Sequence, residues 1–351
     1  ERTYNMAKRI VAIYDRGIDK NLMQGFDVLE KYGYELTLVE KTVNEDELAY
    51  QNSMLSVEVN GPDGTPINEE VFQYLDDAEI IITHFAPVSR RMIESAKNLK
   101  IIATLRTGME NINMEAAKER GIKVINAPGR AAVAVADFTV AAMLCEIRNI
   151  ARTDEDIKTG GWTKKYPNRT YSDNMCNLKV GLVGFGDIGR KIATRLKGFG
   201  TTILAYDPYC TKESIEAFGC VPVSLDELLE QADFVSLHVR LSPQTQNMFG
   251  AAEFAKMKPT AIFVNAARAG LVDEAAMIDA LEQKKIGGAV LDVFREEPLP
   301  VDHPLRKLKN VTLSAHLAGT DIGTFSGSIK IVADNLEQYF SGGELKNVVN
   351  H

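Results

Sequence analysis

The sequence has no uninterrupted apolar run near the roughly 18 residues that a membrane-spanning helix requires. Its first residues also contain no apolar stretch of the kind found in secretory signal peptides. Positive charge is not in excess, because the formal net charge is −8 at pH 7, and this disfavours nucleic acids and anionic membranes as partners. These absences predict a cytoplasmic protein that binds neither nucleic acid nor a membrane.

Cysteine and histidine are both scarce and scattered. The four cysteines, Cys145, Cys176, Cys210 and Cys220, show no C-x-x-C spacing, and the five histidines do not cluster. Neither a disulfide framework nor a metal site is therefore expected. The cysteines are predicted to act as small buried hydrophobic residues.

Apolar residues are plentiful enough for substantial cores. The chain has 351 residues, of which 45% are hydrophobic and 25% charged, and this length allows two domains. Strand-like runs alternate with helical patterns in both halves, which predicts an α/β fold with two doubly wound domains. The expected strands are 9–15, 35–39, 80–83, 101–105 and 123–126 in the first half, and 180–183, 202–206, 233–238, 260–265, 288–292 and 311–314 in the second.

Other segments predict how the domains are joined. The polar, turn-rich residues 44–66 indicate a surface excursion, and the Ala/Val-rich residues 130–150 indicate one buried helix. Residues 154–177 are expected to be irregular. The predicted domains are 1–128 plus 318–351, which includes a closing amphipathic helix, and 129–317.

One glycine-rich turn organises the second domain. Gly184, Gly186 and Gly189 have G-x-G-x-x-G spacing and stand between a β-branched apolar run and a helical pattern. This context favours a dinucleotide site, since the glycines permit a tight turn and a close approach to a pyrophosphate at the helix N-terminus. Asp207 ends the next apolar run, where a carboxylate can bind the ribose hydroxyls and repel a 2′-phosphate. NAD is the predicted cofactor. The alternative is a structural βαβ unit with a solvated Asp207.

Three ionisable residues follow three strands of the same predicted sheet. Arg268, Glu297 and His316 each come just after a strand, at the edge where parallel sheets bind ligands. Singly, each has a structural explanation: a surface arginine, a turn carboxylate and a buried histidine. Together they predict an active site with a cation, a carboxylate and an imidazole.

Several longer signatures then occur in order from about residue 101 to the C-terminus. They include G-I-K-V-I-N-A-P-G, V-G-L-V-G-F-G-D-I-G-R, N-A-A-R-A-G-L-V-D, L-D-V-F-R-E-E-P-L-P and S-A-H-L-A-G. With these motifs the chain resembles the D-isomer-specific 2-hydroxyacid dehydrogenases, in particular their phosphoglycerate-dehydrogenase-like branch. The resemblance implies a flavodoxin-like substrate domain and a Rossmann NAD-binding domain.

The resemblance also implies roles for single residues. Arg268 is similar to the arginine that holds the substrate carboxylate and polarises the C2 oxygen. His316 is similar to the acid/base, and Glu297 to the carboxylate that supports it. No metal is required. The residues expected to contact NAD are Gly184, Gly186, Asp187, Ile188, Gly189, Asp207, His238, Ala266 and Asp292.

The substrate is predicted less closely. Phosphoglycerate dehydrogenases often have an arginine in the loop that here reads Thr-His-Phe-Ala at 83–86, and its absence argues against 3-phosphate binding. Phe85, Arg106 and Gly108, with Arg268, are the expected substrate contacts. Arg106 is hypothesised to contact an anionic or polyhydroxylated substrate. The alternative is a surface arginine at a strand end.

The sequence leaves three candidate functions and predicts one oligomeric state. The first is an NAD-dependent oxidoreductase that interconverts a D-2-hydroxyacid and its 2-oxoacid. The alternatives are a glyoxylate/hydroxypyruvate or sugar-acid reductase and, in a different class, a corepressor that senses NADH. The helix beginning near residue 130 and the irregular segment after it resemble the family's dimerisation region, so a homodimer is expected.

Overall fold

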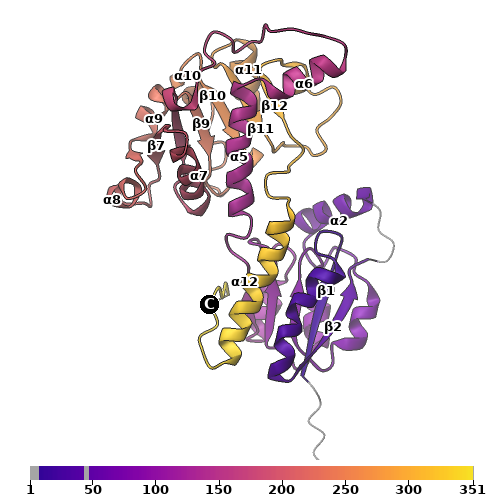
Figure 1. Cartoon of the computed structure of the whole chain (residues 1–351). Helices are drawn as coiled ribbons and strands as arrows, with labels where there is room; N and C mark the ends of the chain where they lie inside the picture. Colours follow the sequence, from indigo (N-terminus) through magenta and orange to yellow (C-terminus); the bar gives the residue numbers. More distant parts are fainter. Residues whose placement is uncertain (1–7, 43–46, 351) are drawn as a thin grey trace, which may run out of the picture. The chain divides into compact units, whose positions relative to one another are not determined.

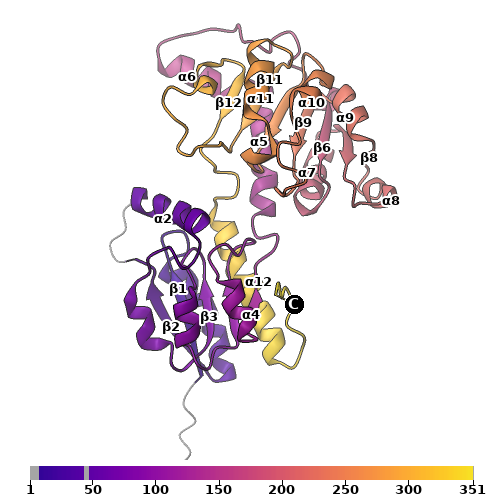
Figure 2. The ribbon, with the colours of Figure 1, turned by 180° about the vertical axis from the view of Figure 1, so that it is seen from behind.

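The chain folds into two compact units, which we describe separately from a computed structural model (Figures 1 and 2). The structure describes residues 8–42 and 47–350. Unit 1 comprises Glu1–Arg130 and Asp321–His351, and unit 2 comprises Ala131–Thr320. These bounds lie two and three residues beyond the predicted domain limits at 128 and 318.

Unit 1 contains a five-stranded parallel sheet in the order β2-β1-β3-β4-β5. This is the flavodoxin-like order, in which the direction of winding reverses between β1 and β3. The elements are β1 (Lys8–Tyr14), α1 (Lys20–Met23), η1 (Gln24–Tyr32), β2 (Tyr34–Glu40), α2 (Glu47–Asn60), η2 (Glu69–Tyr74), β3 (Ala78–Thr83), α3 (Arg90–Ser95), β4 (Ile101–Thr104), α4 (Met114–Glu119), β5 (Lys123–Ile125) and α12 (Ile322–Phe340).

Helical segments cover both faces of this sheet. On one face η1 and α12 pack together against the strands, and Figure 1 shows α12 lying along the sheet. Phe26 of η1 and Val332 and Leu336 of α12 are fully buried there. On the other face, η2, α3 and α4 contribute Val71, Met92 and Ala117. The strands are buried on both faces, which explains their continuous apolar runs.

Unit 2 contains a seven-stranded parallel sheet in the order β12-β11-β10-β9-β6-β7-β8. Its first six strands along the chain have the Rossmann order, and winding reverses between β6 and β9. The elements are α5 (Ala132–Ile147), α6 (Ile150–Lys158), η3 (Met175–Asn177), β6 (Lys179–Val183), α7 (Asp187–Lys197), β7 (Thr202–Tyr206), α8 (Lys212–Glu216), β8 (Val221–Pro222), α9 (Leu225–Gln231), β9 (Phe234–Leu237), α10 (Ala251–Lys256), β10 (Ile262–Asn265), η4 (Ala269–Leu271), α11 (Glu274–Glu282), β11 (Gly288–Leu291), η5 (Pro304–Lys307) and β12 (Val311–Leu313).

Two hydrophobic clusters hold this sheet between helix layers. Helices α5 and α7 pack on one face through residues such as Met143 and Ile192. Helices α9, α10 and α11 cover the other face, where Leu228, Phe254 and Leu281 are buried. Both predicted doubly wound domains are therefore confirmed.

Residues 47–60 are a helix, so the predicted surface excursion over 44–66 is wrong for most of its length. Helix α2 buries Tyr50 and Val57, which are seven residues apart and give too weak a periodic signal to be read from the sequence. The glycine-containing turn expected near its end is present, since Gly61 has a φ of +68°. Residues 43–46 lie outside the described residues.

The predicted single helix over 130–150 is also wrong, because the chain forms two helices there. Asn149 has a φ of +58° and ends the run between α5 and α6. Asparagine tolerates this left-handed conformation better than other non-glycine residues. Helix α6 then continues to Lys158, into the segment that was expected to be irregular.

The cysteine prediction holds for only part of the set. Cys220 is buried, whereas Cys176 is exposed and Cys145 and Cys210 are partly buried. All four are free thiols. Among the helices of the described residues, none has both the length and the apolar character needed to cross a bilayer.

Candidate active site

The glycine turn lies at the point where winding reverses in unit 2, as the sequence predicts. Gly184 follows β6 with a φ of +99°, and a Cβ there would lie 2.6 Å from the carbonyl oxygen of His238. A Cβ on Gly189 would lie 2.4 Å from the carbonyl oxygen of Gly184. Both positions therefore require glycine because of the protein's own packing.

Gly186 differs from these two glycines. It is the N-cap of α7, and a Cβ there would meet no protein atom within 4 Å. Open space at this position suits a pyrophosphate, because the N–H groups of Asp187, Ile188 and Gly189 in the first turn have no acceptor among the described residues. The residues present at this turn therefore fit a bound dinucleotide.

Asp207 lies beside the same turn. It directly follows β7, and its carboxylate accepts hydrogen bonds from the backbone N–H groups of Phe185 and Tyr209, both at 2.8 Å. The first of these bonds ties Asp207 to the glycine turn. The two features that the sequence places about twenty positions apart are thus brought together at one edge of the sheet.

His238 and Ala266 directly follow β9 and β10, which are adjacent in the sheet. The Nε2 of His238 lies 2.8 Å from the hydroxyl of the buried Ser236. Burial lowers the pKa of His238 to about 3, so its imidazole is neutral at pH 7. His238 is therefore excluded as the proton donor near neutral pH.

His316 and Glu297 form the hydrogen-bonded pair that the sequence predicts. The Nδ1 of His316 lies 2.8 Å from Oε2 of Glu297. The other carboxylate oxygen, Oε1, accepts the backbone N–H of Phe294 at 2.9 Å. With Nδ1–H donated to Glu297, the Nε2 nitrogen of His316 has no hydrogen-bond partner within the described part of the chain. That nitrogen is the one available for proton transfer.

Asp292 fastens the loop that carries His316. Its buried carboxylate accepts hydrogen bonds from the Ser314 hydroxyl at 2.6 Å, from the Leu317 N–H at 2.8 Å and from the Ala318 N–H at 2.9 Å. These bonds hold the backbone on both sides of His316, whose φ is +54°. The NAD contact expected of Asp292 stays a prediction.

The charges in this group act on one another. The pKa of His316 is raised, and the hydrogen bond to Glu297 is the main cause. Burial and the positive charge of Arg268 lower this pKa but do not outweigh Glu297. Burial raises the pKa of Glu297, but the hydrogen bonds from His316 and from the Phe294 N–H outweigh it, and Arg268 also lowers that pKa. Arg268 is thus close enough to influence both members of the pair.

Arg268 itself is exposed and lies just after β10. Its Nη1 donates to the backbone carbonyl of Ala267 at 2.7 Å. The Asn265 side chain bonds to both the Arg268 carbonyl and the Ala267 N–H, each at 3.0 Å. This brace fixes the backbone at the start of the loop, from which the exposed Arg268 side chain extends.

The predicted substrate contacts Phe85, Arg106 and Gly108 lie in unit 1. The Arg106 guanidinium stacks 4.0 Å from the centre of the Phe85 ring, so these two are brought together. A Cβ on Gly108 would lie 2.3 Å from Glu110, whose carboxylate pairs with Arg106 at 3.6 Å. Arg106 is 8% exposed and is therefore not the surface arginine of the alternative interpretation.

A buried polar group that was not predicted from the sequence lies in the same part of unit 1. Asp15 follows β1, and both of its carboxylate oxygens lie 3.1 Å from Nδ1 of His84, which follows β3. Nε2 of His84 lies 3.2 Å from the Arg130 guanidinium. Arg268 and His316 were identified as ionisable residues within a few positions of the end of a parallel strand, and Asp15 and His84 meet the same condition.

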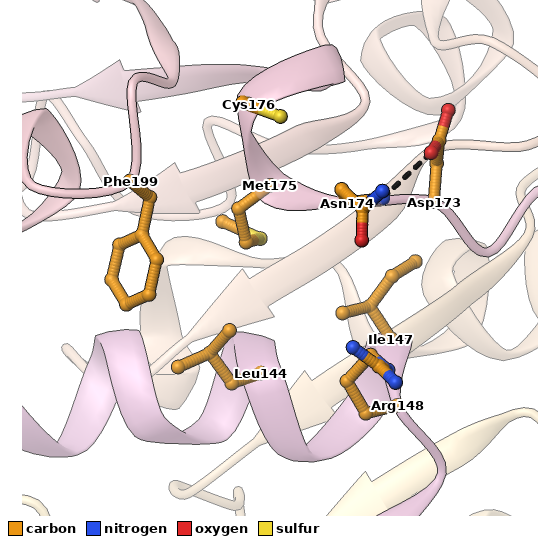
Figure 3. Close-up of a pocket in the computed structure, with 8 residues that line it drawn as sticks. All are labelled: Leu144, Ile147, Arg148, Asp173, Asn174, Met175, Cys176 and Phe199. Carbon is orange, nitrogen blue, oxygen red and sulfur yellow. Dashed lines mark hydrogen bonds between the residues drawn. The ribbon is translucent and has the colours of Figure 1, made fainter.

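A surface hollow of about 360 Å³ lies elsewhere on unit 2, next to the C-terminal end of α5 (Figure 3). Its lining is largely apolar and includes Leu144, Met175 and Phe199. Figure 3 also shows the hydrogen bond from the Asn174 N–H to the Asp173 carboxylate, at 2.7 Å. None of the predicted site residues lines this hollow.

Comparison with known proteins agrees with the glycine turn and the residues around it. Residues 140–318 match the family model described as the NAD binding domain of D-isomer specific 2-hydroxyacid dehydrogenases. This match covers the glycine turn, Asp207 and the Arg268, Glu297 and His316 group. NAD is therefore the cofactor of this domain.

Relatives with assigned names are similar over most of this chain. A D-3-phosphoglycerate dehydrogenase of Methanocaldococcus jannaschii is 39% identical over 80% of this chain and 53% of its own length. A glyoxylate reductase of Korarchaeum cryptofilum is 36% identical over 81% of this chain and 86% of its own length. The chain spans little more than half the length of the D-3-phosphoglycerate dehydrogenases of M. jannaschii and Archaeoglobus fulgidus, at 53% and 59%.

Solved structures share the fold along nearly the whole chain. The TT0316 protein of Thermus thermophilus is 29% identical, with a TM-score of 0.72 over 97% of this chain and 99% of that one. A D-2-hydroxyisocaproate dehydrogenase has a TM-score of 0.78 at 24% identity, covering 98% of this chain and 100% of that chain, and shows the fold alone. From the family model and the relatives together, this chain belongs to the D-isomer specific 2-hydroxyacid dehydrogenase family.

Proposed function

We propose that the protein is an NAD-dependent D-2-hydroxyacid dehydrogenase, an oxidoreductase that acts on CH–OH donors. The observation that carries this proposal is the 2.8 Å pair of His316 and Glu297, with Arg268 acting electrostatically on both. All three side chains belong to the unit that carries the glycine turn. An imidazole with a supporting carboxylate and a guanidinium suits the transfer of one proton at a 2-oxoacid.

His316 manages the proton in this proposal. In the direction of reduction, the imidazolium donates the proton on Nε2 to the C2 oxygen. In the direction of oxidation, the neutral imidazole takes the proton from the C2 hydroxyl. Glu297 holds Nδ1–H in both directions, which fixes the tautomer and stabilises the imidazolium.

Arg268 binds the substrate carboxylate in this proposal and polarises the C2 oxygen. A guanidinium presents parallel N–H donors that match a carboxylate, and lysine lacks this geometry. Its exposure supports the role, because a small anion can reach the guanidinium, and the Asn265 bond holds the backbone from which the side chain extends. The developing charge on the C2 oxygen is stabilised by the same group.

The cofactor would be held by the turn and by the residues that follow the neighbouring strands. The N–H groups at Asp187, Ile188 and Gly189 would bind the pyrophosphate, and Asp207 the adenosine ribose. His238, Ala266 and Asp292 follow β9, β10 and β11, which extend in that order from β6 on the side away from β7. When bound, the nicotinamide supplies or accepts the hydride.

The names of the relatives set the range of substrates. Those that match include D-3-phosphoglycerate dehydrogenases, glyoxylate reductases and a hydroxypyruvate reductase of Thermotoga maritima. We propose a phosphoglycerate-dehydrogenase-like 2-oxoacid substrate, with glyoxylate, hydroxypyruvate or a sugar acid as alternatives. Phe85, Arg106 and Gly108 in unit 1 are proposed to contact it.

A panel of 2-oxoacids tests this function directly. NADH oxidation is followed by its absorbance with glyoxylate, hydroxypyruvate, 3-phosphohydroxypyruvate and sugar-derived C4–C6 acids as substrates. The proposal expects turnover with at least one of them. Tight NADH binding without turnover on any of them contradicts it and supports the sensing, corepressor-like function instead.

The two outer glycines and the middle one are predicted to respond differently to alanine. Gly186→Ala changes the free energy of unfolding by less than about 1 kcal/mol, since the position is an exposed N-cap. It weakens NADH binding, because the methyl group occupies the space that a pyrophosphate requires. Gly184→Ala loses stability by about 1–2 kcal/mol or more, because its φ is positive and the site is crowded.

Thermal unfolding and NADH fluorescence titration on both variants check this prediction. Each variant serves as the control for the other. Equal loss of thermal stability in the two variants, or full NADH affinity in Gly186→Ala, contradicts it.

Glu297→Gln is predicted to change the pH dependence of reduction. The Glu297 carboxylate raises the pKa of His316, so the proton-donating imidazolium is present at low pH and is lost as pH rises through that raised pKa. Glutamine removes the negative charge, which lowers the pKa of His316. The alkaline limb of kcat/KM for reduction therefore moves to lower pH, as a pH series from about 5 to about 10 can measure.

The neighbouring Glu296 provides the control for this measurement. It is exposed, so Glu296→Gln retains the wild-type limb. An unchanged limb in Glu297→Gln shows that the carboxylate does not set the protonation of His316.

We further propose that the protein is a cytoplasmic homodimer. Support for self-association comes from exposed apolar side chains concentrated between residues 133 and 162: Val133 (52% exposed), Ile150 (58%), Ile157 (48%) and Trp162 (79%). We expect light scattering to give twice the chain mass of 38.7 kDa. Trp162→Glu with Ile150→Glu shifts this mass towards the monomer, whereas Val301→Glu, at an exposed apolar residue outside the segment, does not.

A further inference from the structure

Unit 1 has its own reversal of winding, between β1 and β3, and charged side chains gather there. In open α/β sheets this point, at the carboxyl ends of the strands, is where ligands bind. Asp15 follows β1, His84 follows β3 and Arg106 follows β4. All three side chains are buried. Buried ionisable groups at such an edge indicate a binding site more than a structural core.

Asp15 and His84 together orient a second arginine. The Asp15 carboxylate also accepts N–H groups from Ile18 and Phe85, at 3.0 and 3.1 Å. Burial alone raises the pKa of Asp15, but His84 and these N–H groups outweigh it and hold that pKa at about 2. Burial lowers the pKa of His84, against the attraction of Asp15. A neutral imidazole that donates Nδ1–H to Asp15 offers the Nε2 lone pair to Arg130.

Arg130 is left with more donors than acceptors. A guanidinium has five N–H donors, and Arg130 uses Nη1 towards His84 at 3.2 Å and towards the Ser328 hydroxyl at 3.4 Å. No carboxylate oxygen lies within 4 Å of its nitrogens in the part of the chain that the structure describes. A partly buried cation of this kind normally has an anionic partner.

Arg106 adds a second guanidinium to the same place. It stacks on Phe85, whose ring is 4.5 Å from the His84 ring, while Arg130 contacts His84. The His84–Phe85 pair thus contacts both arginines, Arg106 at the Phe85 ring and Arg130 at the His84 imidazole. Burial, followed by repulsion from Arg106, lowers the pKa of Arg130 to about 10. An anion bound beside both arginines relieves this repulsion.

We propose that Arg130, together with Arg106, forms an anion-binding site on unit 1 that takes the second anionic group of a 2-oxoacid substrate. This inference rests on the proposed dehydrogenase function and names its substrate class: 2-oxoacids with a further carboxylate or a phosphate. Arginine suits both groups, because its fork donates two parallel hydrogen bonds to either. His84 and Asp15 act as positioning residues that aim Arg130.

The site is tested by comparing substrates with one and with two anionic groups. The full-length protein with NADH is assayed on pyruvate and glyoxylate, on 2-oxoglutarate for a second carboxylate, and on 3-phosphohydroxypyruvate for a phosphate. The selectivity is the ratio of kcat/KM for a dianionic acid to that for a monoanionic acid. We expect Arg130→Met to lower this ratio at least tenfold, mainly through KM. If the ratio falls more for 2-oxoglutarate, Arg130 binds a carboxylate, and if it falls more for 3-phosphohydroxypyruvate, Arg130 binds a phosphate.

Two further variants separate charge from folding. Arg130→Lys keeps the positive charge but lacks the two parallel N–H donors of the guanidinium, so it lowers the ratio by a smaller factor. This variant tests the site even if Arg130→Met is unstable. Arg91→Met removes an exposed arginine of the same unit, which pairs with Glu69, and retains the wild-type ratio. A ratio unchanged in both Arg130 variants overturns the proposal, as does a ratio lowered equally in Arg91→Met.

Calorimetric titration of 2-oxoglutarate and 3-phosphohydroxypyruvate distinguishes this inference from the proposed function. If no 2-oxoacid is turned over, the dehydrogenase proposal fails. Binding of either dianion that is weakened at least tenfold by Arg130→Met still supports the anion site in that case. Absence of binding to the wild-type protein overturns the site as well.

Discussion

Replacing His316 by glutamine is expected to lower kcat for 2-oxoacid reduction by about 10²- to 10⁴-fold, the contribution typical of a general acid. Glutamine can still bond to Glu297, but it has no titratable proton to deliver to the C2 oxygen. NADH binding stays within about threefold of wild type, because the imidazole acts on the substrate. Steady-state assays and NADH fluorescence titration on the same protein measure the two quantities.

His303 provides a matched control for this substitution. It caps η5, where its Nδ1 accepts the Leu305 N–H at 3.3 Å, and has no part in the proposed site. His303→Gln is expected to retain kcat within about threefold. A His316→Gln protein with near-normal kcat refutes the proton-transfer role and leaves only a nucleotide-binding function for unit 2.

Replacing Arg268 is the second change with a large expected effect. Loss of a bidentate, charge-assisted contact costs about 3–5 kcal/mol, which corresponds to a factor of roughly 10² to 10⁴ in kcat/KM. Arg268→Met is expected to lose this factor through both KM and kcat, since the guanidinium binds the carboxylate and polarises the C2 oxygen. Arg268→Lys keeps the charge and recovers only part of the loss.

The exposed Arg169 of the same unit offers the control, and Arg169→Met should behave as wild type. A pH series adds a readout that depends on proximity. Because Arg268 lowers the pKa of His316, the alkaline limb of reduction in Arg268→Met moves to higher pH. Arg268→Lys with full activity indicates that a point charge suffices and that no bidentate contact forms.

The parallel strands could be predicted because their chemistry is local. Strands buried on both faces appear in the sequence as apolar β-branched runs. Three glycines spaced as G-x-G-x-x-G between a strand and a helix are typical of a dinucleotide-binding turn. Every predicted strand therefore occurs within a few residues of its expected place. The residues in the loops after these strands lie at one edge of the sheet, which is why Arg268, Glu297 and His316 could be grouped in advance.

Elements without a periodic signal could not be predicted. The apolar residues of helix α2 are spread around the helix, so the segment lacks the amphipathic stripe by which a helix is recognised in a sequence. The break at Asn149 interrupts a stretch of strong helix formers, and only the packing around the residue shows it: its side chain bonds to Asn168 at 2.7 Å. A contact to a residue 19 positions away leaves no local trace in the chain.

The sequence by itself determined the two parallel sheets, the glycine turn and which charged residues follow which strand. Each of these features depends on residues that are neighbours along the chain. Tertiary structure alone decided the contacts that no motif or strand end implies. It bonded the Asp292 carboxylate to the loop around His316, and it brought Arg130, His84 and Asp15 together in unit 1. These pairings depend on strand order and on side-chain direction in space, and residues such as Asp15, His84 and Arg130 are too far apart in the chain for any local pattern to join them.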